Sequence, residues 1–343
     1  MVSGSDMHGT PITVTAQQEG KTPEQVAMEY HKLNSDSIER MGISFDLFSH
    51  THTEEHAEVA LSILKKLDDN GYIEPRISEE PYDPIANQFL PDRYVEGTCP
   101  HCNYESARGD QCDDCGKTLD SKELINPRSK LNPDAKIGFR ETEHLFFKLS
   151  EFRDVLLEWL SEGKEHWRPS VINFTRNWLK EGLIDRAVTR DLDWGIEIPR
   201  EGYENKRMYV WFEAVMGYYS ASVHWAKNQG KPDEWKKWWE NEDSEHYYFM
   251  AKDNIPFHTI IWPAMLSGCG YKLPYDVPAN EYLLLDSSQF SKSRRHAIWI
   301  PDYLDRYDPE LLRFYLASIM PEQKDANFTW EDYVTRINTE LIG

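Results

Sequence analysis

Four of the five cysteines lie within seventeen residues, and their spacing limits how this part of the chain can fold. They form two Cys-x-x-Cys pairs, Cys99–Cys102 and Cys112–Cys115. Each pair can form a tight turn that directs two thiolates at one point, and two such turns complete a tetrahedral Zn²⁺ site. Because four protein ligands leave no open position, the spacing predicts one structural zinc ion per chain. Two disulfides are the alternative, but this clustering in a chain without an export signal favours metal.

The other potential metal ligands are interpreted as structural residues. His101 lies between two of the cysteines and is expected to face solvent, whereas the isolated Cys269 is expected in the core. His52 and His56 are four residues apart, a spacing that places both on one face of a helix. The pair lacks a third and a fourth ligand, so we interpret this segment as the capped start of a helix.

Length and charge limit the class of protein. The 343 residues, 40% of them hydrophobic, predict two or three folded domains. The chain has no apolar run of about 18 residues and no signal peptide, which predicts a cytoplasmic protein without a membrane partner. The formal net charge of -21 predicts an acidic surface of the halophilic type. This charge does not by itself favour a nucleic-acid partner, although a locally basic cleft is compatible with it.

Capping motifs predict where the N-terminal elements begin. Residues 1–3 are expected to be the end of a strand, and residues 4–11 a loop from that strand to a helix. Thr22, Pro23 and Gln25 have the spacing of a capping box and predict a helix start. A second helix is expected to open at 51–54 and to end near Asn70.

Apolar patterns predict the remaining elements. Segment 137–149 is expected to form two strands, and it is followed by two amphipathic helices over 152–160 and 171–181. Three apolar runs, 208–212, 246–251 and 281–285, have the character of buried strands separated by helical stretches. This alternation predicts a parallel sheet flanked by helices, and the chain after Pro301 is expected to be helical.

The segment 287–295 follows the third apolar run. It combines small hydroxyl residues with Lys292, Arg294 and Arg295, a composition suited to stabilising phosphate charge. The alternative is an ordinary solvated basic loop.

The sequence FSKS at 290–293 resembles the KMSKS signature of class I aminoacyl-tRNA synthetases. Further segments resemble the methionyl-tRNA synthetases, in particular those of archaeal type, and cover essentially the whole chain in the family's order. They are SDMHGTPI (5–12), FLPDRYVEGTCPHC (89–102), VTRDLDWGIEIP (188–199), YVWFEAVMGYYSAS (209–222), AKDNIPFHTIIWPAML (251–266) and DANFTWEDYVTRINTEL (325–341).

This resemblance implies a fold and a domain organisation. The expected fold is α/β: a doubly wound Rossmann-type parallel sheet, an inserted connective-peptide domain with a zinc knuckle, and the start of a C-terminal helical domain. The implied parts are 1–71 (first part of the Rossmann domain), 72–190 (insertion), 191–285 (second part) and 286–343 (KMSKS-type loop and start of the helical domain). The nucleotide is expected at the carboxyl ends of the parallel strands.

The resemblance also implies a methionine site. Asp6 would bind the ammonium group of the substrate and would pair with Arg190, which would lower the pKa of the carboxyl group. The side-chain pocket would be formed by Trp211, Ala214, Tyr218, His258 and Trp262. Aromatic rings make favourable contacts with a thioether, so no metal is needed to recognise the sulfur. The alternative is that these aromatic residues belong to an ordinary core.

An ATP site follows from the same resemblance. Asp253 would hold the ribose hydroxyls, Ser291, Lys292 and Ser293 would bind ATP, and Lys292 would be the catalytic lysine. The implied reaction is attack by the methionine carboxylate on the α-phosphate of Mg²⁺-bound ATP, followed by transfer of methionine from the adenylate to the methionine tRNA. A carboxylate is a nucleophile at pH 7, so positioning and charge stabilisation are sufficient. The enzyme is expected to be a monomer.

Several departures from the family pattern leave other interpretations open. Gln289 stands where the loop of the family has its first lysine, Ala251 replaces a common glycine, and Val215 a common proline. The His-x-Gly-His motif of the family is expected upstream of Met1, and the anticodon-binding domain is expected beyond Gly343. The chain is therefore expected to be a fragment with impaired activity. The alternatives are a catalytically inactive, zinc-stabilised paralogue that binds tRNA or protein, and a synthetase for isoleucine, leucine or valine.

Overall fold

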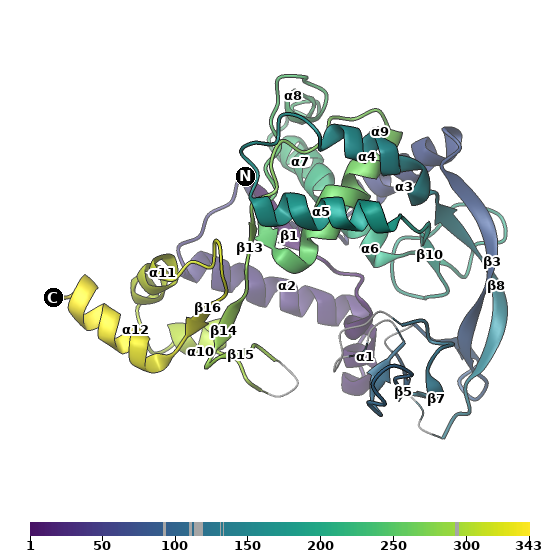
Figure 1. Ribbon diagram of the computed structural model, residues 1–343, viewed down its shortest axis with the longest axis horizontal. Helices are drawn as coiled ribbons and strands as arrows, with labels where there is room; N and C mark the ends of the chain where they lie inside the picture. Colours follow the sequence, from purple (N-terminus) through teal and green to yellow (C-terminus); the bar gives the residue numbers. More distant parts are fainter. Residues whose placement is uncertain (92–93, 110–111, 113–118, 131, 133, 292–294) are drawn as a thin grey trace.

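The computed structural model describes residues 1–91, 94–109, 112, 119–130, 132, 134–291 and 295–343. Figure 1 shows helix α2 (Pro23–Arg40) running between the C-terminal helices and the region that contains the cysteines. The largest hydrophobic cluster extends from Ala60 to Ala279 in the sequence. Two smaller clusters are centred on Tyr315 and on Val95. No helix in the described ranges has both the length and the apolar character needed to span a membrane.

The chain opens with a parallel β-α-β unit. Strand β1 (Val2–Ser5) pairs in parallel with β2 (Leu47–His50) in a register that places Val2 opposite Leu47. Helices α1 (Thr10–Glu19) and α2 connect the two strands. The strand predicted at residues 1–3 is therefore present, but it continues to Ser5, and the loop that follows is shorter than predicted.

The two predicted helix starts are confirmed. Thr22 accepts a hydrogen bond from the Gln25 amide, and the Gln25 side chain accepts one from the Thr22 amide, which completes the capping box of α2. Helix α3 (Glu54–Asp69) is capped by Thr53 and ends at Asn70. Both helices start where local hydrogen bonds satisfy amides that have no partner inside the helix.

Further parallel pairing occurs in the second half of the chain. Strand β12 (Met250–Ala251) pairs with β13 (Ala279–Asn280), and β14 (Leu283–Leu285) pairs with β16 (Ala326–Phe328). Strand β15 (Ser288–Gln289) joins the other edge of β14 in antiparallel orientation. Among the described residues, the parallel strands thus form three hydrogen-bonded groups rather than one continuous sheet. The α/β class is confirmed, although the strands are shorter than the apolar runs suggest.

The apolar run 208–212 is mainly helical, contrary to the prediction. Strand β11 (Arg207–Met208) pairs with β10 (Thr189–Arg190), and the chain then forms α6 (Val210–Glu213), a 3₁₀ turn (Ala214–Met216) and α7 (Gly217–Asn228). Phe212, Met216 and Tyr219 are all buried, and their spacing of four and three residues is that of one helix face. A short apolar run does not reveal this period, because the period appears only when the pattern is followed beyond residue 212.

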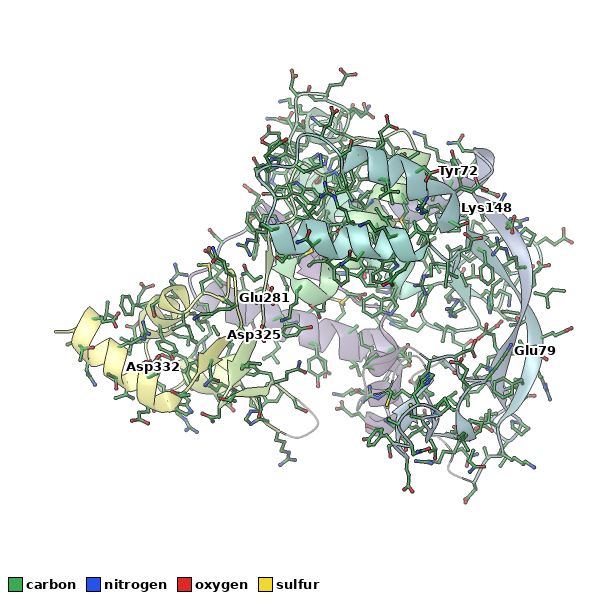
Figure 2. All side chains as sticks on the ribbon, viewed as in Figure 1. Tyr72, Glu79, Lys148, Glu281, Asp325 and Asp332 are labelled. Carbon is green, nitrogen blue, oxygen red and sulfur yellow. The ribbon has the colours of Figure 1, made fainter. Side chains whose placement is uncertain are left out.

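The segment 137–149 contains one long strand, where two were predicted. Strand β8 (Gly138–Phe147) pairs along its length with β3 (Ile73–Asp83), from Phe147 opposite Ile73 to Gly138 opposite Tyr82. No glycine or proline interrupts the strand after Gly138, so nothing favours a turn. The two strands form the curved ribbon at one side of the molecule, with Glu79 on its outer part and Tyr72 and Lys148 near its base (Figures 1 and 2).

Short strands and helices complete the region between β3 and β10. The strands are β4 (Gln88–Phe89), β5 (Val95–Thr98), β6 (Ala107–Arg108), β7 (Ile125–Ser129) and β9 (Arg186–Ala187). The predicted amphipathic helices are α4 (Arg153–Trp159), which follows a 3₁₀ turn, and α5 (Pro169–Glu181). Leu156 and Leu179 are buried in the largest cluster, whereas Val155 and Phe174 face outward.

The remaining helices flank the second half of the chain. They are α8 (Lys236–Trp239), a 3₁₀ turn (Lys252–Asn254), a π-helical segment (Phe257–Ile261), α9 (Trp262–Gly268), α10 (Ile300–Leu304), α11 (Pro309–Ser318), α12 (Trp330–Arg336) and a final π-helical segment (Ile337–Leu341). The chain after Pro301 is thus mostly helical, but it also contains β16, which the apolar pattern does not predict. Cys269, predicted in the core, is buried after α9.

Candidate functional site

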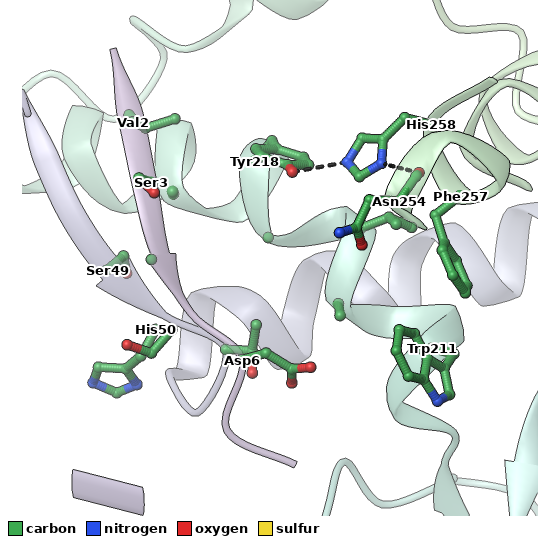
Figure 3. Close-up of a pocket in the computed structure, with 17 residues that line it drawn as sticks. Val2, Ser3, Asp6, Ser49, His50, Trp211, Tyr218, Asn254, Phe257 and His258 are labelled. Atoms are coloured by element: carbon green, nitrogen blue, oxygen red, sulfur yellow. Dashed lines mark hydrogen bonds between the residues drawn. The ribbon is translucent and has the colours of Figure 1, made fainter. Parts of the chain in front are cut away.

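A cavity of about 230 Å³ opens beside the end of β1. Figure 3 shows Asp6 at the end of this strand, with Trp211, Phe257, Tyr218 and His258 on the other side of the hollow. Its lining consists of Val2, Ser3, Gly4, Ser5, Asp6, Ser49, His50, Thr51, Trp211, Ala214, Val215, Gly217, Tyr218, Ala221, Asn254, Phe257 and His258. The cavity therefore combines one acidic wall with one aromatic wall.

Helical periodicity creates the aromatic wall. Trp211, Ala214 and Tyr218 follow one another at i, i+3 and i+7, so the segment from α6 to α7 presents all three to the cavity. The Trp211 ring stacks on Phe257 with a centroid distance of 4.8 Å and an interplanar angle of 20°. The structure thus brings together five of the predicted methionine-site residues, because Asp6 and His258 line the same space.

Tyr218 and His258 form a polar pair in this wall. His258 Nδ1 lies 3.0 Å from the carbonyl oxygen of Asn254, so this nitrogen carries the proton. His258 Nε2 is then an acceptor for the Tyr218 hydroxyl at 2.8 Å. Burial lowers the pKa of His258 to about 4 and raises the pKa of Tyr218 to about 12. Both side chains are therefore neutral at pH 7.

Asp6 is the acidic group of the cavity. Its side chain is exposed to the hollow, yet protein atoms surround it on the other sides because the site is concave. This desolvation, reinforced by the negative charge of Glu213, raises the pKa of Asp6 to about 7. The His8 amide, 3.4 Å from the carboxylate, acts in the opposite direction. The carboxyl group is thus poised to ionise fully when a cation enters.

The predicted pairing of Asp6 with Arg190 is wrong for this structure. Both residues lie in the described part of the chain, and no ion pair joins them. Arg190 donates to the carbonyl oxygen of Thr189 at 3.0 Å and lies over the Tyr209 ring at 4.3 Å. Arg190 therefore does not lower the pKa of Asp6, which burial and the charge of Glu213 raise.

Trp262 supports the cavity from behind and does not line it. Its side chain is fully buried, and its indole nitrogen donates to the Tyr248 hydroxyl at 3.0 Å. Tyr248 in turn packs edge-on against Tyr218, with a centroid distance of 5.0 Å. Trp262 therefore acts on the aromatic wall through Tyr248.

Asp253 lies in a separate hollow of about 290 Å³, lined also by Ser170, Phe174, Lys252, Ile255, Glu281 and Tyr282. Lys252 donates hydrogen bonds to Glu281 at 2.6 Å and to Asp325 at 2.8 Å. It thus bridges these two acidic residues, which lie next to each other in Figure 2. Asp253 itself is exposed, and its oxygen accepts a weak hydrogen bond from Asn254 at 3.3 Å.

The described part of the KMSKS-type loop is held at both ends. The Ser291 and His296 backbones exchange hydrogen bonds of 2.9 and 3.0 Å, and His296 Nε2 contacts the carbonyl oxygen of Leu285. The predicted residues Lys292 and Ser293 lie outside the described residues.

Three of the predicted zinc ligands converge. The sulfur atoms of Cys99, Cys102 and Cys112 lie within 4.8 Å of one another, and those of Cys102 and Cys112 are 3.6 Å apart. A tetrahedral zinc site with Zn–S bonds of about 2.3 Å requires sulfur–sulfur distances of roughly 3.8 Å, so this arrangement fits a metal. The fourth predicted ligand, Cys115, lies outside the described residues. His101 is exposed, as predicted.

A buried network behind the cavity was not predicted. The fully buried Glu213 carboxylate contacts His8 Nδ1 through one oxygen, at 2.9 Å, and His56 Nε2 through the other. His56 Nδ1 lies 2.8 Å from the Ser220 hydroxyl. His52 and His56, considered as a metal pair in the sequence, thus belong to a hydrogen-bond network, because His52 Nδ1 lies 3.1 Å from His8 Nε2. No local sequence signal links residues this far apart.

Comparison with known proteins identifies the family. The family model for class I tRNA synthetases (M) matches residues 1–343. A methionine–tRNA ligase of Dehalococcoides mccartyi is 56% identical over 344 residues, which cover 100% of this chain and 62% of the relative. The corresponding protein of Thermomicrobium roseum is 54% identical and is covered to 59%, and that of Thermoplasma volcanium is 49% identical and is covered to 63%. The chain thus spans about 60% of the length of these relatives.

A solved structure agrees in fold. The crystal structure of Mycobacterium tuberculosis methionyl-tRNA synthetase bound by methionyl-adenylate superposes with a TM-score of 0.75 at 20% identity, over 100% of this chain and 61% of that one. At this identity the likeness establishes the Rossmann-like fold alone. The match of the family model over residues 1–343 shows that the chain belongs to the methionyl-tRNA synthetases, a family of class I tRNA synthetases.

Proposed function

We propose that this chain activates methionine with ATP and serves the charging of methionine tRNA. The observation that carries this proposal is the cavity itself, in which Asp6 faces a wall of Trp211, Tyr218 and His258. A free amino acid has an ammonium group that requires a carboxylate partner. The thioether of methionine is apolar and polarisable, and aromatic rings are favourable neighbours for it.

Each described residue has a defined task in this reaction. The Asp6 carboxylate binds the substrate ammonium group, and Trp211 and Ala214 contact the side chain. Tyr218 and neutral His258 provide the polar part of the wall without a charge that would be costly to desolvate beside the apolar thioether. The substrate carboxylate is left free to attack the α-phosphate of ATP, so the chain supplies orientation and needs no general base.

The nucleotide is assigned to the second hollow and to the KMSKS-type loop. Asp253 would accept hydrogen bonds from the ribose hydroxyls, while Ser291, Lys292 and Ser293 would contact the phosphates. Mg²⁺ enters with ATP and neutralises phosphate charge. The methionyl group is then transferred to the tRNA.

The zinc ion and the assembly complete the proposal. Cys99, Cys102 and Cys112, with Cys115, would hold one structural Zn²⁺ that stabilises the small cluster around Val95. The insertion 72–190 divides the catalytic parts 1–71 and 191–285, with the helical part beginning at 286. We expect the enzyme to act as a monomer.

Methionine-dependent ATP–pyrophosphate exchange tests the proposal directly. The chain is expected to exchange pyrophosphate with methionine and at least tenfold more slowly with isoleucine, leucine or valine. Asp6→Asn is the matched inactive variant, because it keeps the size of the side chain and removes the charge. Absence of exchange, together with retained binding of methionine tRNA, would instead support an inactive binding paralogue.

A further inference from the structure

We propose that Glu213 is a positioning residue of the ammonium site, which holds the Asp6–His8 loop through His8 and adds a second negative charge behind Asp6. This inference rests on the proposed function for its substrate. It assigns a role to a residue that does not line the cavity.

The geometry places Glu213 between the two walls. The helical segment from α6 to α7 turns Trp211, Ala214 and Tyr218 toward the cavity and Glu213 away from it. On this hidden side, one carboxylate oxygen contacts His8 of the Asp6 loop, and the other contacts His56 of α3. Glu213 therefore joins the acidic wall to the aromatic wall through a single buried group.

Other contacts also hold the loop that carries Asp6. The Met7 amide donates to the Thr51 hydroxyl at 3.0 Å, and the Met7 carbonyl accepts from the Trp194 indole at 2.8 Å. The His8 ring packs edge-on against Trp194, with a centroid distance of 5.3 Å. Within this frame the contact between His8 and Glu213 is the one that involves a buried charge, which makes it the strongest hydrogen bond of the set.

The charge of Glu213 is maintained despite its burial. Desolvation would raise its pKa, but the hydrogen bonds from His56 and His8 outweigh this effect and keep the pKa below its usual value. Glu213 is thus ionised at neutral pH. Among the described residues, the titratable groups around Asp6 and Glu213 include His8 on the loop, His52 and His56 on the segment after β2, and Glu24, 4.0 Å from His52. His50, Tyr218 and His258 line the same cavity as Asp6.

Two carboxylates near one ammonium group have a functional consequence. Their mutual repulsion disfavours the empty, fully ionised site, and an incoming cation relieves it. The arrangement selects for a positively charged group at this end of the cavity. It also predicts a pH dependence that a purely structural Glu213 would not produce.

Glu213→Gln tests the proposal, because it keeps the shape of the side chain and removes its charge. Methionine binding is measured by calorimetry between pH 5.5 and 8.5 in the parent, in Glu213→Gln, in Asp6→Asn and in the double variant. At pH 8, Glu213→Gln is expected to bind methionine at least about tenfold more weakly, the effect of one charge-assisted hydrogen bond. The pH below which the methionine affinity falls, here called the acid limb, is expected to move to a lower value. Asp6 ionises more readily without the neighbouring charge.

Asp185→Asn is the matched control. Asp185 is a partly buried carboxylate that accepts hydrogen bonds from Ser150 and Arg76 and does not line the cavity. This variant is expected to leave methionine affinity and the acid limb unchanged. In the Asp6→Asn background, Glu213→Gln should have little further effect, because Glu213 acts through Asp6. An unmoved acid limb, or additive losses in the double variant, would overturn the proposal.

A second measurement keeps the outcome separate from the proposed function. The carbon resonance of the Asp6 carboxyl group, assigned by its loss in Asp6→Asn, reports the ionisation of Asp6 without methionine. The pH midpoint of this titration is expected to fall in Glu213→Gln even if the chain binds no methionine. Absence of methionine binding would count against the proposed function alone. If Glu213→Gln does not fold, Glu213→Asp is used, which keeps the charge. Its Asp6 midpoint should stay near that of the parent, and a parent midpoint below 5 would overturn the proposal.

Discussion

The Tyr218 hydroxyl lies 2.8 Å from His258 Nε2 and donates a hydrogen bond to it. The direction of this bond follows from the contact that the other ring nitrogen makes. The other ring nitrogen contacts the Asn254 carbonyl oxygen, so the histidine accepts from tyrosine. The aromatic wall thereby contains a defined tautomer, and it remains uncharged across the physiological pH range.

Tyr218→Phe removes the donor and leaves His258 Nε2 buried without this partner. We expect a loss of stability of about 1–3 kcal/mol, the cost of an unsatisfied buried polar atom. The KM for methionine should rise as the ring of His258 loses its orientation. Denaturant unfolding and exchange kinetics measure the two effects, with Tyr307→Phe as the exposed control. Equal stability of both variants would contradict the proposed tautomer.

The affinity for methionine should rise as the pH increases through about 7. The pKa of Asp6 is raised to about 7 in the empty site, and only the ionised carboxylate attracts an ammonium group. Calorimetric titration at pH 6 and pH 8 checks the sign, and Asp6→Asn should abolish the pH dependence together with most of the affinity. Binding that is stronger at pH 6 than at pH 8 would be inconsistent with this role of Asp6.

The same raised pKa makes Asp6 a cost to stability in the empty protein. A carboxyl group with a higher pKa in the folded state than its model value of 3.8 binds its proton more tightly when folded. The favourable contribution of protonated Asp6 to the free energy of unfolding is therefore complete below pH 4. It is lost as the pH rises toward and beyond 7. Asp6→Asn should raise the free energy of unfolding at pH 8 relative to the parent, as measured in urea, and this difference should shrink at pH 5.

Removal of zinc should unfold the knuckle locally. The small cluster around Val95 includes Cys99 and Cys112 themselves, so a metal bound by their sulfur atoms would contribute directly to the stability of this cluster. We expect about one zinc per chain by elemental analysis, and none in Cys112→Ser. Hydrogen exchange over residues 94–130 should accelerate in that variant while Leu64 and Leu67 of α3 remain protected. Unchanged exchange in the knuckle would show that zinc is dispensable.

Gly268→Ala should destabilise the contact between α9 and α3. An added Cβ would lie 2.7 Å from Leu67 Cδ2 and 2.9 Å from Phe152 Cζ, both in the main core. Overpacking of this kind costs about 1–3 kcal/mol, to be measured by thermal unfolding. Gly138→Ala is the control, because its Cβ would meet no atom within 4 Å. A loss of the same size in both variants would mean that the effect is one of backbone conformation.

Local signals in the sequence determined the elements that depend on near neighbours. The capping box at Thr22 and the cap at Thr53 were predictable because the donors and acceptors lie within three residues of one another. The spacing of the cysteine pairs likewise predicts the convergence of their sulfur atoms, which the structure bears out for Cys99, Cys102 and Cys112. The apolar run 208–212 predicts a strand but is mainly helical, because hydrophobicity alone does not distinguish a short strand from one helical turn.

Only the tertiary structure decided which distant charges meet. Glu213 contacts His8 across 205 positions and His56 across 157, whereas Arg190 lies over the Tyr209 ring and forms no ion pair with Asp6 in the described part of the chain. The resemblance of the sequence to the family pointed to Asp6, Trp211 and Tyr218 as site residues, whereas the residues by themselves left an ordinary aromatic core as the alternative. Their pKa values and partners depend on burial and distance, which arise only when segments remote in the chain are packed together.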